Sequence, residues 1–310
     1  MSLNPTKIPW CDVTWNPFTG CTKGCEYCYA RAVARRFGDN TYSAGEDVAG
    51  VSWVEAQKSL DGEVFPFGFH PTIYPHRVDE PLKRKKPTRI FLGSMGDLFD
   101  PAFSDEFRDR VFAAVTATPQ HTYILLTKQP QEMQRYFVGV ASDYATWPGR
   151  VDDQGMAERI LPNLWLGVTV TNQEDANDRI PWLIGTNVAH RFVSVEPMMG
   201  PIDLCSFPLR DGDHLDPRNL YAIGVDAGID LVIAGAKTPG KPLHTWLSHG
   251  DMDRLYPGHV DAGVEGYQPR AWLRSLREQC LEAGVPFHYK HGGTNPELDG
   301  VVHDALGVES

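Results

Sequence analysis

Apolar runs of strand length alternate with segments of helical periodicity along most of the chain, and this alternation restricts the fold more than any other feature. The apolar runs are rich in branched and aromatic residues and occupy residues 90–92, 122–126, 164–170, 191–195, 231–234 and 287–289. Several are nearly continuous, as is typical of a parallel sheet that is covered on both faces. The helical segments are residues 26–37, 104–118, 131–138, 173–184 and 269–283. This order predicts right-handed βαβ units, in either an open doubly wound sheet or a complete or partial TIM-like barrel.

Two of the predicted helices carry end signals. Ser104 is placed to cap the second helix, with Glu106 early in its first turn, where a carboxylate complements the helix dipole. Gly284 and Pro286 follow the last helix as stop signals.

The 310 residues are compatible with one α/β domain, which we predict for residues 1–310. Residues 38–81 interrupt the alternation with many aromatic side chains, which predicts an ordered insertion packed against the barrel. Residues 139–162, 203–228 and 240–268 are rich in Gly, Pro, Asp and His, which is typical of surface loops. Loops of this length are often lids or binding loops.

Composition limits the location and partners of the chain. No apolar run approaches the roughly 18 residues that suggest a membrane span, and no secretory signal is visible. With few cysteines, half of them clustered, the sequence predicts a cytoplasmic, reduced protein without a membrane partner.

Charge argues against broad adhesion to nucleic acid. The 29 Lys and Arg residues are outnumbered by 40 Asp and Glu residues, for a net charge of -11. The dense basic run at residues 83–86 would suit a phosphate backbone, but we favour a solvated entry to the following strand.

A short loop carries three cysteines, Cys21, Cys25 and Cys28, in a C-x3-C-x2-C pattern with Tyr27 directly before the last thiol. Such a loop can aim three thiolates at one centre but offers no local fourth ligand. Because clusters held entirely by protein normally take four cysteines, the pattern predicts an iron-sulfur cluster with one open iron. The alternative is a structural zinc site completed by Cys11 or a distant histidine, although no second cysteine knuckle is present.

The cysteine loop resembles the signature of radical S-adenosylmethionine (SAM) enzymes. With further segments, the chain resembles a phage-associated family of unknown function that has a radical-SAM-like cysteine motif. The resembling segments are residues 15–21, 87–99, 126–130, 165–173, 194–202 and 272–280.

The resemblance selects the partial TIM-like (βα) barrel with mainly parallel strands. It implies that Cys21, Cys25 and Cys28 hold a 4Fe-4S cluster whose fourth iron is chelated by SAM. Reductive cleavage of SAM would then give methionine and a 5′-deoxyadenosyl radical that abstracts hydrogen from a substrate. The implied partners are an electron donor such as flavodoxin or ferredoxin and a substrate that the resemblance does not identify. The phage association of the resembling family makes a nucleobase, a nucleotide or nucleic acid the candidate class.

The remaining candidate site residues follow predicted strands, where ligands gather in α/β proteins. The family motif places Tyr27 near the adenine. We assign Asp97, with Ser94 beside it, to the SAM amino group, and Lys128 to the SAM carboxylate or a substrate anion. As alternatives, Asp97 is a turn carboxylate and Lys128 a solvated residue.

Three further candidates come later in the chain. Thr169 and Asn172 occupy positions where family members often contact the ribose, although a helix cap is the slightly favoured interpretation. Glu196 follows an apolar strand and is expected to face a cation, a hydrogen-bonding network or the ligand.

Lys237 stands where the phage-associated family has an acidic residue, so its charge is inverted. This departure keeps open a non-catalytic iron-sulfur or zinc-binding regulatory protein on the same fold. We expect Cys11, Cys205 and Cys280 to be packing residues, and His288 and His291 to be ordinary packing or surface histidines.

Overall fold

The computed structural model describes residues 3–37, 54–55, 65–138, 150–151, 157–158, 161–204, 228–235, 269–290, 297–298 and 301–302, and the statements below concern these residues. The chain divides into two compact units, which are described separately. The first comprises residues 1–167 and 186–190, and the second comprises residues 168–185 and 191–310.

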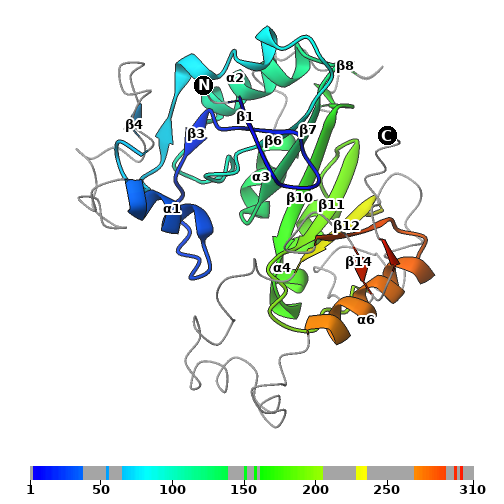
Figure 1. Ribbon diagram of the computed structural model, residues 1–310. Coiled ribbons are helices and arrows are strands. Elements are labelled where there is room, and N and C mark those ends of the chain that lie inside the picture. The colour runs from blue at the N-terminus through cyan, green and yellow to red at the C-terminus, as the bar shows by residue number, and fades with distance from the viewer. Residues whose placement is uncertain are drawn as a thin grey trace. The chain divides into compact units, whose positions relative to one another are not determined.

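Eight strands form an open, mostly parallel sheet (Figure 1). Their order is β1 (Leu3–Pro5), β2 (Val13–Trp15), β6 (Arg89–Leu92), β7 (Thr122–Thr127), β10 (Leu164–Val170), β11 (His190–Val195), β12 (Leu231–Gly235) and β13 (Phe287–Lys290). Strand β1 runs antiparallel to β2, whereas β2, β6 and β7 are parallel, as are β11, β12 and β13. The sheet is consistent with a partial TIM-like fold, and the barrel is not closed.

All six predicted strands are present, and none differs from its prediction by more than one residue at an end. The predicted helices are also present, as α1 (Tyr29–Phe37), α2 (Asp105–Thr116), α3 (Pro130–Val138), α4 (Gln173–Ile184) and α6 (Pro269–Glu282). Helix α1 begins later than predicted because the cysteine loop continues through Cys28, whose N–H bonds the carbonyl of Cys25 at 3.2 Å. Ser104 caps α2 by accepting the N–H of Phe107, and Gly284 ends α6 with a φ of 68°.

Several short elements were not predicted, because strands of two residues have no readable periodicity. Strands β3 (Phe18–Thr19), β5 (Thr72–Ile73) and β4 (Val54–Glu55) form a small sheet in the first unit. Two hairpins are β8 (Arg150–Val151) with β9 (Ala157–Glu158) and β14 (Glu297–Leu298) with β15 (Val301–Val302). Two 3-10 helices, η2 (Pro75–Arg77) and η3 (Pro81–Lys83), precede β6.

The core of the first unit lies where β2, β6 and β7 meet the aromatic residues of the small sheet and α2. Trp15, Phe18, Leu92, Phe112 and Tyr123 are fully enclosed. Each such side chain contributes about 1.5–3 kcal/mol through burial. Part of the aromatic insertion also belongs to the buried set, which includes Phe65, Ile73 and Tyr74.

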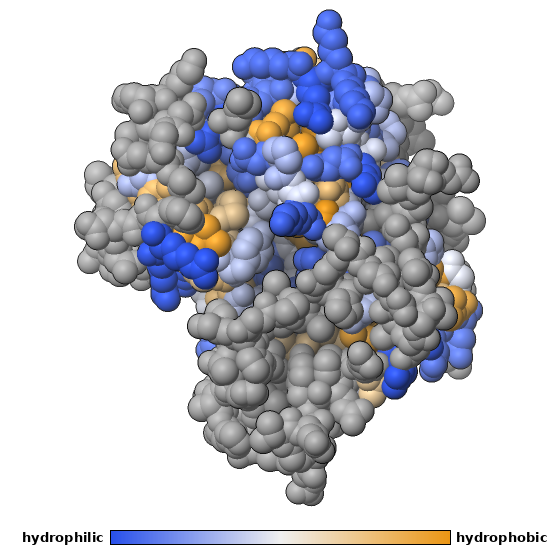
Figure 2. All heavy atoms as spheres, in the orientation of Figure 1, coloured by the Kyte–Doolittle hydropathy of each residue, from blue (hydrophilic) through white to orange (hydrophobic). Residues whose placement is uncertain are grey.

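The basic run at residues 83–86 is solvated, which is the interpretation that we favoured from the sequence. Lys83, Lys85 and Lys86 are exposed, and Arg84 turns back to donate to the hydroxyl of Thr88 at 2.6 Å. Figure 2 shows hydrophilic residues gathered at the top of the view, over the cyan segment of Figure 1. None of the described helices is both long and apolar enough to cross a membrane.

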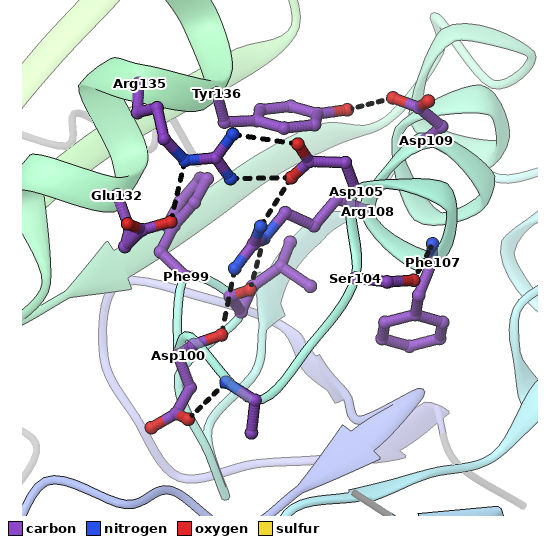
Figure 3. Close-up of polar contacts among 12 residues, drawn as sticks. Phe99, Asp100, Ser104, Asp105, Phe107, Arg108, Asp109, Glu132, Arg135 and Tyr136 are labelled. Atoms are coloured by element: carbon purple, nitrogen blue, oxygen red, sulfur yellow. Dashed lines mark hydrogen bonds and ion pairs between the residues drawn. The ribbon is translucent and has the colours of Figure 1, made fainter. Parts of the chain in front are cut away.

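A charged network joins α2 to α3 in the first unit (Figure 3). Asp105 pairs with Arg135 at 2.9 Å and also with Arg108, whose side chain is buried. The hydrogen bonds from Arg135, followed by those from Arg108, lower the pKa of Asp105 to about 2. A carboxylate with a lowered pKa stabilises the folded state above its ordinary pKa of roughly 4, and this contribution is lost as the pH falls toward the folded value.

We therefore expect Asp105→Asn to reduce the dependence of stability on pH between about 4 and about 2. Because the side chain of Asp105 is 45% exposed, the loss of unfolding free energy at neutral pH should stay below about 1 kcal/mol. Urea unfolding of both proteins across this pH range measures the effect. An unchanged pH dependence in the variant would refute the assignment.

Candidate functional site

Strands β2, β6 and β7 run parallel, so their carboxyl ends lie at the same side of the sheet in the first unit. Trp15 pairs with Leu92, and Leu92 pairs with Leu125, so these parallel strands end nearly level. The segments that follow them emerge side by side, at the edge where ligands bind in α/β proteins. They contain Asn16, residues 93–97 and Lys128.

The cysteine loop begins with a close contact to the end of β6. The N–H of Gly20 donates to the carbonyl of Met95 at 3.0 Å, and Gly20 forms a parallel bridge with Gly96. Gly20 has a φ of 82°, and a Cβ there would lie 2.3 Å from the carbonyl oxygen of His70. Only glycine fits this position without strain, and its fit fixes where Cys21 starts the loop.

The three loop cysteines, Cys21, Cys25 and Cys28, are half-buried free thiols. The Sγ of Cys21 accepts the N–H of Lys23, and the Sγ of Cys28 accepts the N–H of Arg31, both at 3.3 Å. Such bonds stabilise a sulfur that carries negative charge.

Burial, followed by the nearby carboxylates of Asp97 and Asp100, raises the pKa of the Cys21 thiol. A thiol in these surroundings keeps its proton unless a cation compensates the charge. In the part of the chain that the structure describes, no three His, Cys, Asp or Glu side chains form a set that could hold a metal ion.

Asp100 anchors the middle of the loop, and the sequence did not point to it. Its Oδ2 accepts the N–H of Thr22 at 2.7 Å, the hydroxyl of Thr22 at 2.9 Å and the amide of Gln129 at 3.1 Å. The side chain of Asp100 is fully buried. The loop is therefore tied to the segment that follows β6 and to the residue before α3.

Asp97 links the ends of β6 and β7. Its Oδ1 accepts the hydroxyl of Thr127 at 2.8 Å and the N–H of Phe99 at 3.1 Å, and its Oδ2 accepts the N–H of Lys128 at 2.9 Å. Burial raises the pKa of this carboxyl, although these hydrogen bonds oppose the shift. The bond to Phe99 is the turn role that the sequence allowed for Asp97.

Lys128 and Tyr27 lie together beside the loop. The ammonium of Lys128 is 5.9 Å from the centre of the Tyr27 ring, within the range of a cation–π contact. The carbonyl of Lys128 accepts the ammonium of Lys23 at 2.6 Å. Thus two of the predicted residues, one from the loop and one from the end of β7, contact each other.

Ser94 is held by two residues that the sequence did not single out for the site. Its hydroxyl lies 3.0 Å from the side-chain nitrogen of Asn16, and its carbonyl accepts the hydroxyl of Tyr29. The side-chain oxygen of Asn16 also accepts the N–H of Met95 at 3.0 Å. The signal for Asn16 was its place in the resembling segment 15–21, and the signal for Tyr29 was its position directly after Cys28.

The other candidates belong to the second unit. Asn172 caps α4 by accepting the N–H of Asp175 at 2.8 Å, as the favoured interpretation predicted. Thr169 is buried in β10, and its carbonyl accepts a hydrogen bond from Arg179. Glu196 forms an ion pair with Lys290, which agrees with the expectation that it would face a cation.

Some of the residues that we expected to be packing or surface residues lie in the described part of the chain, and others do not. Cys11, Cys280 and His288 are buried. Cys205, Lys237 and His291 lie outside the described residues.

The fold and the site together define an α/β protein whose parallel strands lead into a three-cysteine loop. The chain belongs to the family described as "Protein of unknown function (DUF5131)", whose model matches residues 5–247. No curated protein matches the chain.

Two solved structures are similar to this chain. One is spore photoproduct lyase complexed with dinucleoside spore photoproduct, with a TM-score of 0.47 and 10% sequence identity. The other is a cysteine-to-alanine mutant of spore photoproduct lyase, with a TM-score of 0.45 and 10% identity. Each match covers 93% of this chain and 79% of the other.

Proposed function

We propose that this chain is a radical SAM-type enzyme, in which Cys21, Cys25 and Cys28 hold a 4Fe-4S cluster and the adjacent residues bind SAM. The observation that carries the proposal is the anchoring of the cysteine loop at the ends of β6 and β7, next to Asp97 and Lys128. When bound and reduced by one electron, such a cluster supplies reductive cleavage of the sulfonium and a radical that abstracts hydrogen.

The donor set fits a cluster of this kind. Three thiols lie on one loop, and backbone N–H groups already point at the sulfurs of Cys21 and Cys28. Hydrogen bonds to the sulfurs are among the features that set cluster potentials. A four-iron cluster holds its thiolates further apart than a single ion does, so three thiols that do not form a single-ion site among the described residues are still compatible with a cluster.

Lys128 is suited to bind a carboxylate. Its ammonium rests over a neutral ring, so an anion that approaches it gains a charge-assisted hydrogen bond. Because Asp97 accepts the N–H of Lys128 and the hydroxyl of Thr127, it fixes the backbone from which the lysine extends.

Asp97 also keeps capacity for the amino group of SAM. Its Oδ2 accepts one described hydrogen bond, and a carboxylate oxygen has two acceptor sites. Ser94 would act beside it through its hydroxyl, and Tyr27 would flank the adenine. Roles for Thr169 and Asn172 at the ribose and for Glu196 as a second acidic contact remain predictions from the sequence.

A zinc site completed by Cys11 is disfavoured by the placement of that residue. Cys11 precedes the amino end of β2, where the N–H of Asp12 donates to Arg89 at the start of β6. The cysteine loop is attached beyond the carboxyl end of β6. Strand β6 has four residues and spans about 13 Å, so Cys11 and the loop stand at opposite ends of it.

The substrate follows from the resemblance and the charge. The phage association of the resembling family suggests a nucleobase or nucleotide, and the net charge of -11 favours a small region of nucleic acid over wide duplex contact. The electron donor is expected to be a flavodoxin or ferredoxin in the cytoplasm.

Anaerobic reconstitution tests the proposed activity. Protein loaded with iron and sulfide and reduced with dithionite should convert SAM to methionine and 5′-deoxyadenosine. Lys128→Met should raise the KM for SAM about tenfold or more, because it removes one charge-assisted contact, while leaving the iron content unchanged. No product from fully loaded, reduced protein would instead support the non-catalytic alternative.

A further inference from the structure

The carboxylate of Asp100 is the most extensively bonded acidic group at the site. It is fully buried and accepts four described hydrogen bonds, with Oδ2 taking three and Oδ1 taking the N–H of Ala102 at 3.0 Å. A buried carboxylate is costly unless its acceptor sites are filled. Donors from Thr22 and Gln129 occupy the acceptor sites of Oδ2, and both residues are therefore held against Asp100.

The backbone around Asp100 is itself fixed from α2, as Figure 3 shows. The guanidinium of Arg108 donates to the carbonyl of Leu98 at 3.1 Å and to the carbonyl of Asp100 at 2.9 Å. Arg108 is 1% exposed and is paired with Asp105, which Arg135 holds in turn. The backbone of Asp100 is therefore held from α2, through contacts that do not involve the loop.

Thr22, which lies between Cys21 and Cys25, is the loop residue that bonds Asp100. It is exposed, yet both its N–H and its hydroxyl donate to the same oxygen of Asp100. The start of the loop is held by Gly20 on Met95, and its end is held by Tyr29 on Ser94. Asp100 supplies the tie to the buried interior between these two points.

We propose that Asp100, acting through Thr22, is a positioning residue that fixes the cysteine loop before any metal binds. That the loop holds a cluster rests on the proposed function, whereas the positioning of the loop by Asp100 does not. A preorganised loop loses less conformational entropy when three sulfurs must meet one cluster. Loss of the tie should therefore loosen the loop in the apoprotein and weaken cluster binding in the loaded protein.

Hydrogen–deuterium exchange of the metal-free, full-length protein tests the positioning. In Asp100→Asn the amide nitrogen either faces the donors of Thr22 and Gln129, or faces the N–H of Ala102 and leaves Thr22 and Gln129 bonded to a neutral oxygen, which is a weaker acceptor than a carboxylate. Peptides covering residues 20–28 should therefore exchange about tenfold faster or more. Peptides from α2 and β7 should keep their protection. Asp109→Asn is the matched control, because it removes a carboxylate that bonds Tyr136 in the network of Figure 3 but does not reach the loop.

Thr22 provides a second pair of variants with little risk to folding, because the residue is exposed. Thr22→Val removes the hydroxyl and should raise loop exchange and lower the iron bound per chain, whereas Thr22→Ser should match the native protein. If Asp100→Asn unfolds the protein, the difference in loop exchange between Thr22→Val and Thr22→Ser tests whether the contact with Asp100 positions the loop. Unchanged loop exchange in Thr22→Val, or in a folded Asp100→Asn, overturns the proposal.

The two proposals fail in different ways. If the native protein binds no iron, the proposed function fails, while the exchange comparison still decides whether Asp100 positions the loop. If the native protein binds iron, and the bound iron and the electron paramagnetic resonance spectrum of the reduced protein are unaltered in Thr22→Val and in Asp100→Asn, the expected weakening of cluster binding is wrong, while loop exchange in the metal-free protein decides the positioning.

Discussion

Cys25→Ala is expected to abolish the brown colour, the broad absorption at about 400 nm and the formation of 5′-deoxyadenosine. Cys25 is the middle of three thiols, and no other described cysteine lies on the loop. Loss of one of three protein ligands should weaken cluster affinity by more than the roughly 10–100-fold effect of losing an outer-shell contact. Iron and sulfide analysis of anaerobically reconstituted protein measures the result.

Cys280→Ala is the control for this experiment. Cys280 is buried on α6 in the second unit, and its loss removes a thiol of the same chemistry without touching the loop. It should keep the iron content and the activity. Full iron loading in Cys25→Ala would show that the ligands are misassigned.

Gly20→Ala is expected to destabilise the protein by about 3 kcal/mol or more and to prevent cluster loading. The added Cβ would lie 2.3 Å from the carbonyl oxygen of His70, and the φ of 82° is unfavourable for alanine. Backbone must move to relieve the contact, and the residue that moves with it is Cys21. Urea unfolding and iron analysis measure the two effects.

Gly24→Ala gives the matched comparison on the same loop. A Cβ at Gly24 meets nothing within 4 Å, and the residue is exposed. This variant should fold and load iron as the native protein does. Equal behaviour of the two variants would show that the close approach of Gly20 to His70 does not determine the loop conformation.

The sequence predicted the elements that depend on local pattern. Strand β10 and helix α4 match their predicted bounds, because β10 is a continuous apolar run and α4 begins at a capping residue, Asn172. Ser104 and Gly284 likewise marked helix ends by chemistry that acts within a few residues. Such signals can be recognised from the sequence because they depend only on neighbouring residues.

The contacts that shape the candidate site are not local, and the sequence did not reveal them. Asp100 is 78 residues from Thr22, and Tyr29 is 65 residues from the carbonyl of Ser94 that it bonds. A single sequence does not distinguish a buried aspartate such as Asp100 from an exposed one. The sequence singled out the cysteines, Asp97 and Lys128 because motif spacing and strand ends mark them, but their mutual contacts depend on register.

The role of Asp97 illustrates the same limit. The sequence allowed a turn carboxylate or a ligand contact, and the hydrogen bond to Phe99 forms the turn. The bonds to Thr127 and the N–H of Lys128 arise from the parallel pairing of β6 with β7, which brings the two strand ends together. Pairing of that kind follows from the whole sheet and not from either strand alone.

Mössbauer spectroscopy of protein reconstituted with enriched iron tests the central claim, that three thiolates leave one iron open to SAM. We expect a four-iron cluster in which adding SAM changes the signal of one iron and leaves the other three as they were. A spectrum that SAM does not alter, or a protein that takes up zinc in place of iron, would contradict it.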